Sequence, residues 1–281
     1  MTSQPAGRGA EVSDTVLSVE AADALLLSVI LDDEGRQDPV PIYRRLIAES
    51  PRWRSAFGMT VLATYADGLE YLRNPRWGRA EEDMDLPPGL SGAAARRRER
   101  DDVNTMLFMN PPDHTRVRGL VARAFTPKMV ERLRPEIDAL LTPILDEVAE
   151  LGECDILSTL AVPFPVAVIS ALLGVPQDAS GEFVGRVRDI TSLIDAAADD
   201  ATLDRAMAAA ADVAGFFVEL IEDKRARPDD GLLSALIEVE AEGDRLSEEE
   251  LIVNSMLMYA AGFETTTNLI GNGLRALLLH S

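Results

Sequence analysis

The sequence contains very little cysteine or histidine: one cysteine and two histidines in 281 residues. A single cysteine excludes an intrachain disulfide. Cys154, His114 and His280 are too few and too scattered to form a zinc site of known spacing. The chain also has no Gly-rich phosphate loop and no G-x-S-x-G motif. The sequence therefore offers no zinc centre, no phosphate cradle and no nucleophile elbow.

Basic charge and long apolar runs are also scarce. Lysine and arginine number 27 against 48 acidic residues, for a net charge of −21, which argues against nucleic-acid binding because that needs a basic footprint. The apolar run Ala24–Leu31 is too short to span a membrane. No basic segment with an apolar run and cleavage site marks a signal peptide. We therefore expect a soluble cytoplasmic protein with neither nucleic acid nor membrane as partner.

The local patterns predict a mainly α protein with a small β element near the N-terminus. Aromatic and β-branched residues on either side of Gly58 predict a hairpin. Residues 78–104 lack periodicity and are expected to form a long loop. The predicted strands are Trp53–Phe57 and Met59–Tyr65, and the predicted helices are 38–50, 66–73, 110–125, 126–152 (with Pro135 and Pro143 as break or kink points), 160–173, 178–194, 203–227, 230–240 and 247–281.

The last predicted helix, 247–281, has the clearest helix signals in the sequence. Ser247 and Glu250 form a capping box at its start, and no proline follows Leu246. Some 30 helical residues span roughly 45 Å, the width of a whole domain. Such a helix must run through a core.

Within this helix, residues 260–266 form an unusual run, Ala-Ala-Gly-Phe-Glu-Thr-Thr. Gly262 weakens a helix, and the Thr265 hydroxyl can bond back to the carbonyl of Ala261. Glu264 adds an ionisable acid beside that hydroxyl. This combination predicts a groove that holds a small ligand and moves protons; the alternative is a kinked central helix.

A second cluster follows the prolines at 111 and 112. His114 and Arg118 are four residues apart and share one helix face, where they could bind paired carboxylates. Arg116 points elsewhere and, with Arg123, Lys128, Arg132 and Arg134, is expected to form a basic patch. The alternative for His114 and Arg118 is a solvated face without a ligand.

Together these motifs resemble bacterial cytochromes P-450. The segment Asn110-Pro-Pro-Asp-His-Thr-Arg-Val-Arg118, followed by Ala124-Phe-Thr-Pro127, is similar to one stretch of that family, and Ala261-Gly-Phe-Glu-Thr-Thr266 to its oxygen-binding helix. The resemblance covers residues 36–281 in the family's order. Asn110 stands where the family often has Asp, and both residues cap helices well.

The resemblance implies a cytochrome P-450 fold, truncated after the long central oxygen-binding helix. We expect residues 1–20 to be a disordered tail and 21–281 to be a single incomplete domain. The family's activity is that of a haem-dependent monooxygenase of secondary metabolism. It inserts one atom of O2 into a small organic substrate and reduces the other to water, with electrons from NAD(P)H passed through a redox partner. Haem would be the cofactor and O2 the co-substrate.

The resemblance also implies roles for particular residues. His114 and Arg118 would bind the haem propionates, and Ala261 and Gly262 would border the bound oxygen. Glu264 and Thr265 would be catalytic and deliver protons for O–O cleavage. The loop at 78–104 would cover the substrate pocket, and the basic patch around Arg116 and Arg123 would face a ferredoxin-type electron donor.

The family's thiolate iron ligand is not found in these 281 residues. It should follow the oxygen-binding motif, whereas Cys154 precedes it and lies between Glu153 and Asp155, whose charges disfavour a thiolate. We expect Cys154 to be a buried or half-buried structural residue, and the chain alone to be inactive. Two alternatives stay open: a non-catalytic helical remnant that acts only in binding or interaction, and an unstable fragment with an exposed core.

Overall fold

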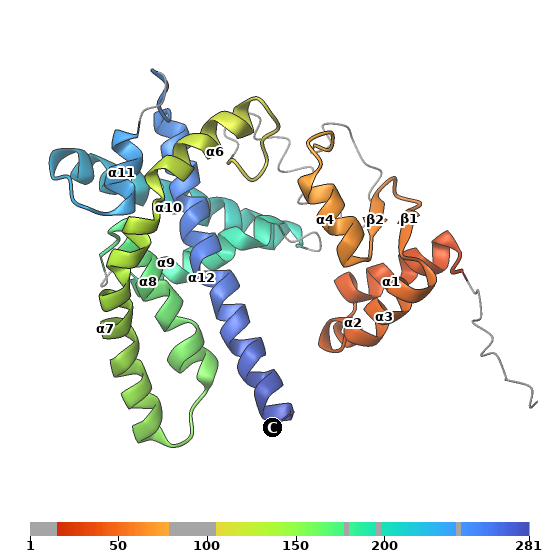
Figure 1. The fold of residues 1–281 in the computed structure, drawn as a ribbon. Helices are drawn as coiled ribbons and strands as arrows, with labels where there is room; N and C mark the ends of the chain where they lie inside the picture. The colour runs from red at the N-terminus through yellow and green to blue at the C-terminus, as the bar shows by residue number, and fades with distance from the viewer. Residues whose placement is uncertain (1–15, 79–104, 177–179, 195–197, 240–242, 281) are drawn as a thin grey trace, which may run out of the picture. The chain divides into compact units, whose positions relative to one another are not determined.

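The computed structural model describes residues 16–78, 105–176, 180–194, 198–239 and 243–280 (Figure 1). Helices dominate this part of the chain and one small sheet accompanies them, which confirms the predicted fold class. The chain divides into two compact units, Met1–Ser91 and Gly92–Ser281. Almost all of the predicted loop at 78–104 and residues 1–15 of the predicted tail lie outside the described residues, while Val19 and Glu20 already belong to a helix.

The N-terminal unit combines helices with a β-hairpin. Its two strands are antiparallel, with Trp53 opposite Val61, which confirms the hairpin around Gly58. Helix α1 is not among the predicted elements, although Ser18 caps it by accepting the Ala21 N–H at 3.2 Å. The elements are α1 (Val19–Leu31), α2 (Asp33–Gln37), α3 (Val40–Glu49), β1 (Arg52–Arg54), β2 (Thr60–Leu62) and α4 (Tyr65–Arg73).

A buried carboxylate joins α1 to the hairpin. Asp23 is 4% exposed and accepts hydrogen bonds from the Trp53 indole N–H and the Ala56 backbone N–H, both at 2.8 Å. Trp53 also packs with Ala22 and Leu46 in the small core of this unit. The hairpin is therefore attached to α1 by both polar and apolar contacts.

Helices make up most of the described residues of the C-terminal unit. The long helix α12 packs against α8, α10 and the π-helix η1, and its path through this unit can be followed in Figure 1. The elements are α6 (Asp113–Ala124), α7 (Pro127–Leu151), η1 (Leu157–Ala161), α8 (Pro163–Leu173), α9 (Ser180–Thr191), the 3-10 helix η3 (Ser192–Ile194), α10 (Asp200–Ala226), α11 (Leu232–Glu238) and α12 (Glu248–Leu279).

An aromatic cluster occupies the centre of this unit. The ring of Phe183 in α9 lies 4.8 Å from that of Tyr259 in α12, in an edge-to-face arrangement, and 4.6 Å from that of Phe216 in α10. Such pairs add about 0.5–1.5 kcal/mol beyond the burial of their surface. Phe217 and Phe263 extend the cluster and are at most 1% exposed. The predicted central position of α12 is thus confirmed.

Proline changes two of the predicted helix boundaries. Helix α6 begins at Asp113, so the predicted start at residue 110 is wrong. A residue that precedes proline is disfavoured in the α region, which keeps Pro111 outside the helix. The Asn110 carbonyl nevertheless accepts the His114 N–H at 3.0 Å. Pro135 and Pro143 are predicted break or kink points of α7; the helix is continuous from Pro127 to Leu151, so neither breaks it.

Candidate functional site

The predicted ligand-binding run lies in the middle of α12. The Thr265 hydroxyl donates a hydrogen bond to the Ala261 carbonyl oxygen at 2.7 Å, as predicted. The next hydroxyl, of Thr266, donates to the Gly262 carbonyl at 3.2 Å. The helix is continuous from Glu248 to Leu279, so these hydroxyls add to the ladder without ending it.

One side of this run is open and the other is packed. Ala261 and Thr265 are exposed and Glu264 is half-buried, whereas Tyr259 and Phe263 are fully buried. Residues four apart lie on the same side of a helix. Ala261 and Thr265 therefore form one small, accessible surface, with the Glu264 carboxylate next in sequence to Thr265.

Gly262 is accounted for by packing. A Cβ atom at this position would lie 2.6 Å from Cδ1 and 2.9 Å from Cγ1 of Ile169 in α8. Its side-chain direction is thus occupied by α8, and Gly262 can border a ligand only through its backbone. The sequence shows a glycine in a helix but not the neighbour that requires it.

Helix α6 carries the second predicted cluster. Val117, Leu120 and Val121 are buried and anchor the helix, while Arg118 is exposed and His114 is half-buried. Because His114 and Arg118 are four residues apart, they lie on the same side of α6. A permanent cation and an imidazole N–H can thus meet an anion there.

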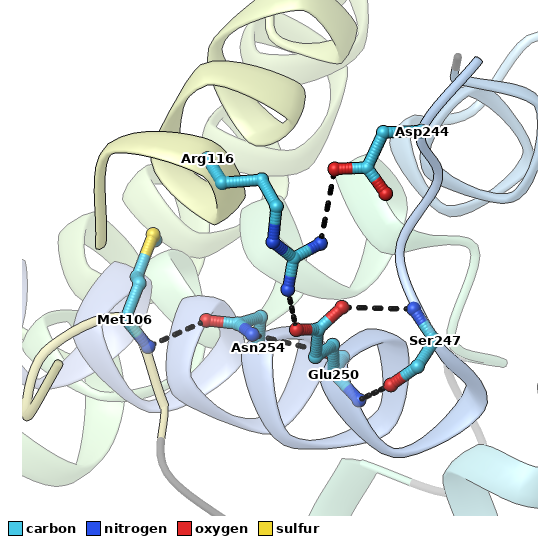
Figure 2. A network of polar contacts seen from close by, with 6 residues as sticks. All are labelled: Met106, Arg116, Asp244, Ser247, Glu250 and Asn254. Carbon is cyan, nitrogen blue, oxygen red and sulfur yellow. Dashed lines mark hydrogen bonds and ion pairs between the residues drawn. The ribbon is translucent and has the colours of Figure 1, made fainter. Parts of the chain in front are cut away.

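The sequence did not predict the partners of Arg116. Its guanidinium forms ion pairs with Glu250 and with Asp244, the latter at 3.4 Å (Figure 2). The hydrogen bond to Glu250 is the main cause that raises the pKa of Arg116 above its usual value. Its charge is therefore already neutralised. Both partners lie more than 120 residues away in the sequence, so spacing could not predict them, and the donor-facing role of Arg116 stays a prediction.

The remaining cations of the predicted basic patch do not form one free surface either. Arg132 pairs with Asp230 at 3.1 Å, and Arg134 pairs with Glu131 at 3.2 Å. Arg123 and Lys128 are exposed. The nearby acidic residues, abundant in this chain, thus offset much of the local positive charge.

Glu250 belongs to a network that joins α6 to the start of α12. It accepts the Ser247 N–H at 2.9 Å, and its own N–H donates to the Ser247 hydroxyl at 3.1 Å, which completes the predicted capping box (Figure 2). Asn254, one turn later, accepts the Met106 N–H at 3.0 Å. Helix α6 is thus attached near the start of α12. At 1.5 Å per residue, Glu250 lies about 16 Å from Ala261 along the helix axis.

The available side chains fit only part of a haem site. Arg118 and His114 suit its anionic edge, and the small surface of Ala261 and Thr265 suits its oxygen side. Within the described part of the chain, no three His, Cys, Asp or Glu side chains gather in a group that could hold a metal ion. Cys154 is half-buried, as predicted, and lies just after α7.

These features agree with the comparisons with known proteins. The cytochrome P450 family model matches residues 90–281, and the chain belongs to this family. It is 39% identical over 256 residues to cytochrome P450 107B1 of Saccharopolyspora erythraea, covering 88% of this chain and 61% of that protein. It is 36% identical over 255 residues to the vitamin D(3) 25-hydroxylase of Pseudonocardia autotrophica, covering 87% and 59%. The chain thus spans about three fifths of these relatives' length.

Solved structures give the same result. The LnmA cytochrome P450 hydroxylase of the leinamycin biosynthetic pathway of Streptomyces atroolivaceus matches with a TM-score of 0.70 and 32% identity, over 85% of this chain and 59% of that one. CYP164A2 of Mycobacterium smegmatis matches with a TM-score of 0.72 and 33% identity, over 90% and 63%. The predicted cytochrome P-450 fold is confirmed over the part that the chain spans.

None of the helices in the described ranges has both the length and the apolar character that crossing a bilayer demands.

Proposed function

We propose that this chain contributes the oxygen side of a haem-dependent monooxygenase. The reaction inserts one atom of O2 into a small organic molecule and reduces the other to water, with electrons from NAD(P)H passed through a ferredoxin-type partner. The observation that carries the proposal is the exposed surface of Ala261 and Thr265 in the family's oxygen-binding helix, with the hydroxyl held to the Ala261 carbonyl. Family membership supports it.

Each proposed residue has a physical role. The Arg118 guanidinium and the His114 imidazole donate hydrogen bonds to the haem propionates, and Arg adds a permanent charge. Ala261 and the Gly262 backbone border the small ligand and leave room for it. Haem, when bound, supplies the redox chemistry.

Thr265 and Glu264 form the proton path. Because the Thr265 O–H donates to the Ala261 carbonyl, the hydroxyl oxygen keeps its lone pairs to accept a hydrogen bond from water or from a protonated ligand. Glu264 is half-buried and can exchange protons with solvent. Glu264 would release a proton to such a water, and the Thr265 oxygen would hold that water beside the ligand.

The substrate class follows from the relatives. One relative, 38% identical over 254 residues, is the polyketide biosynthesis cytochrome P450 PksS of Bacillus subtilis, and the LnmA hydroxylase belongs to the leinamycin biosynthetic pathway. We propose a small organic substrate of secondary metabolism for this protein.

A chimaera tests the oxygen role. The chain is joined to the remaining part of cytochrome P450 107B1, and product formed per O2 consumed is measured with a substrate that the chimaera hydroxylates. Loss of a positioned proton-transfer group usually lowers a rate by about 10²–10⁴. For the ratio of product to O2 consumed, we expect Thr265→Ala to cause a roughly tenfold decrease. Thr266→Ala, which removes the neighbouring hydroxyl, is the matched control and should keep the ratio. An unchanged ratio in Thr265→Ala would refute the assigned role.

The alternative function, a non-catalytic remnant that acts in binding only, is favoured by one observation: Cys154 is the only cysteine and lies after α7. We propose that the 281 residues alone are catalytically inactive. The carbon monoxide difference spectrum of the purified chain with added haem tests this. A thiolate-type band would show that the chain forms the centre by itself.

A further inference from the structure

Helix α8 packs directly behind the oxygen-binding run of α12. Cδ1 and Cγ1 of Ile169 lie 2.6 and 2.9 Å from where a Cβ atom of residue 262 would stand. Real side chains do not approach that closely, so any residue other than glycine must push the two helices apart or displace Ile169. Ile169 is 6% exposed and β-branched, which leaves it little freedom to move.

The next residue of α8 makes a second contact with α12, at Tyr259 just before this run. The Ser170 and Tyr259 hydroxyls share a hydrogen bond at 3.0 Å, and both residues are 0% exposed. Burial raises the pKa of Tyr259, so its hydroxyl stays protonated. An alternative position of α12 would leave two buried hydroxyls without partners, which is costly.

Together the two contacts define how α12 is placed. The Gly262–Ile169 contact sets the separation of the helices, and the Tyr259–Ser170 bond, three residues earlier on α12, restricts rotation about the helix axis. Both contacts lie on a side of α12 that α8 covers, whereas Ala261 and Thr265 are exposed. Their orientation therefore depends on α8.

We propose that Ile169 and Ser170 are positioning residues that hold Ala261 and Thr265 toward the ligand side. Gly262 serves the same end as the close-packing partner of Ile169. The inference rests on the proposed function for one point only, namely which side of α12 faces the ligand. The orientation of α12 can be measured without haem, oxygen or substrate. A failure of the positioning role can therefore be distinguished from a failure of the proposed function.

The first experiment compares two glycines of α12 in the full chain. Gly262→Ala should lower Tm by roughly 5 °C, the shift for one to two kcal/mol in a chain of this size. Gly273→Ala is the matched control, because nothing lies within 4 Å of a Cβ at 273; it should leave Tm unchanged or raise it, since Ala favours helix over Gly. In an Ile169→Ala background, Gly262→Ala should lower Tm less than half as much as it does in the wild type, because the clash is removed.

The second experiment measures orientation. Cys154 is replaced by Ala, a single cysteine is placed at 265 (exposed) or at 267 (9% exposed), and the rates of reaction with a thiol reagent are compared. With Gly262 present, residue 265 should react roughly 100-fold faster than residue 267, because a buried thiol reacts only through local opening. Gly262→Ala should lower this ratio roughly tenfold.

Tyr259→Phe provides an independent test, because it keeps the packed ring and removes only the bond to Ser170. It should also lower the ratio of the labelling rates at 265 and 267. If Gly262→Ala does not fold, Tyr259→Phe takes its place as the test. A ratio that stays constant in the folded variants, whatever happens to Tm, would overturn the proposal and leave α8 as ordinary packing.

Discussion

Thr266 and Thr267 are adjacent in α12, yet only one of their hydroxyls has a protein partner. The Thr266 hydroxyl donates to the Gly262 carbonyl at 3.2 Å, whereas that of Thr267 is buried without a hydrogen-bond partner. A buried unsatisfied polar group costs about 1–3 kcal/mol. The two threonines thus provide a matched pair for measuring what a buried hydroxyl does in this helix.

We expect Thr267→Val to raise the free energy of unfolding by about 1 kcal/mol, because a methyl group replaces an unsatisfied hydroxyl of similar size. Thr266→Val removes a hydroxyl that is hydrogen-bonded and should be neutral or destabilising by up to about 1 kcal/mol. Urea unfolding followed by circular dichroism measures both. A destabilised Thr267→Val would show that its hydroxyl has a partner, such as a buried water.

The Arg116–Glu250 pair should contribute measurably to stability. Arg116→Ala leaves a Glu250 carboxylate that is 17% exposed without its cation, and we expect a loss of about 1–3 kcal/mol. Arg134→Ala removes the same side chain from an exposed pair within one helix, and should cost at most about 0.5 kcal/mol. Equal losses in the two variants would show that the pair at the start of α12 has no special role.

Two further variants separate the ion pair from the helix cap. Glu250→Gln keeps a side chain that can complete the capping box but removes the charge that Arg116 binds, whereas Ser247→Ala removes the cap and keeps the ion pair. We expect each to cost about 1 kcal/mol. Their effects are measured by urea unfolding, and the double variant should be close to additive, unless the cap orients Glu250 toward Arg116.

In the N-terminal unit, Asp23→Ala should release Trp53. Removing the carboxylate leaves the buried indole and Ala56 N–H groups without their acceptor, a loss of about 2–4 kcal/mol in two hydrogen bonds to a charged group. Trp77→Phe as background makes Trp53 the only tryptophan, so a red-shifted tryptophan emission reports the change. Asp33→Ala, whose side chain is 86% exposed, is the control and should leave the emission unchanged.

The features that the sequence predicted correctly depend on residues close together in the chain. The capping box involves Ser247 and Glu250, and the back-bond involves Thr265 and Ala261. Both need only the regular geometry of one helix. The start of α6 was predicted less well because two consecutive prolines follow Asn110, and their local restrictions outweigh a good capping residue.

The features that were not predicted depend on distant partners. Arg116 was expected on a donor-facing surface, but its partners are Asp244 and Glu250. Gly262 was expected to open a groove, yet its side-chain direction is filled by Ile169 of α8. Spacing along the chain gives the face on which a residue lies, but it does not give the element that covers that face.

Asp229 should make stability depend on acid pH. Burial raises the pKa of its carboxyl, but hydrogen bonds from Lys224, Ser234 and the Gly231 N–H lower it more, so the net pKa lies below its usual value. A group whose pKa is lower in the folded state adds stability above its unfolded pKa, near 3.9. That stability is lost as the pH falls through the folded pKa.

We therefore expect the wild type to be more stable than Asp229→Asn at pH 5–7, with a constant difference, and this difference to shrink as the pH falls below about 3.9. Urea unfolding of both proteins at a series of pH values measures it. Asp230→Asn is the control: its side chain is 93% exposed, so it should change stability by at most about 0.5 kcal/mol. If the difference between wild type and Asp229→Asn is as large at pH 2.5 as at pH 6, the ionised Asp229 carboxylate is not its cause, because stability that comes from a lowered pKa must decrease below the unfolded value.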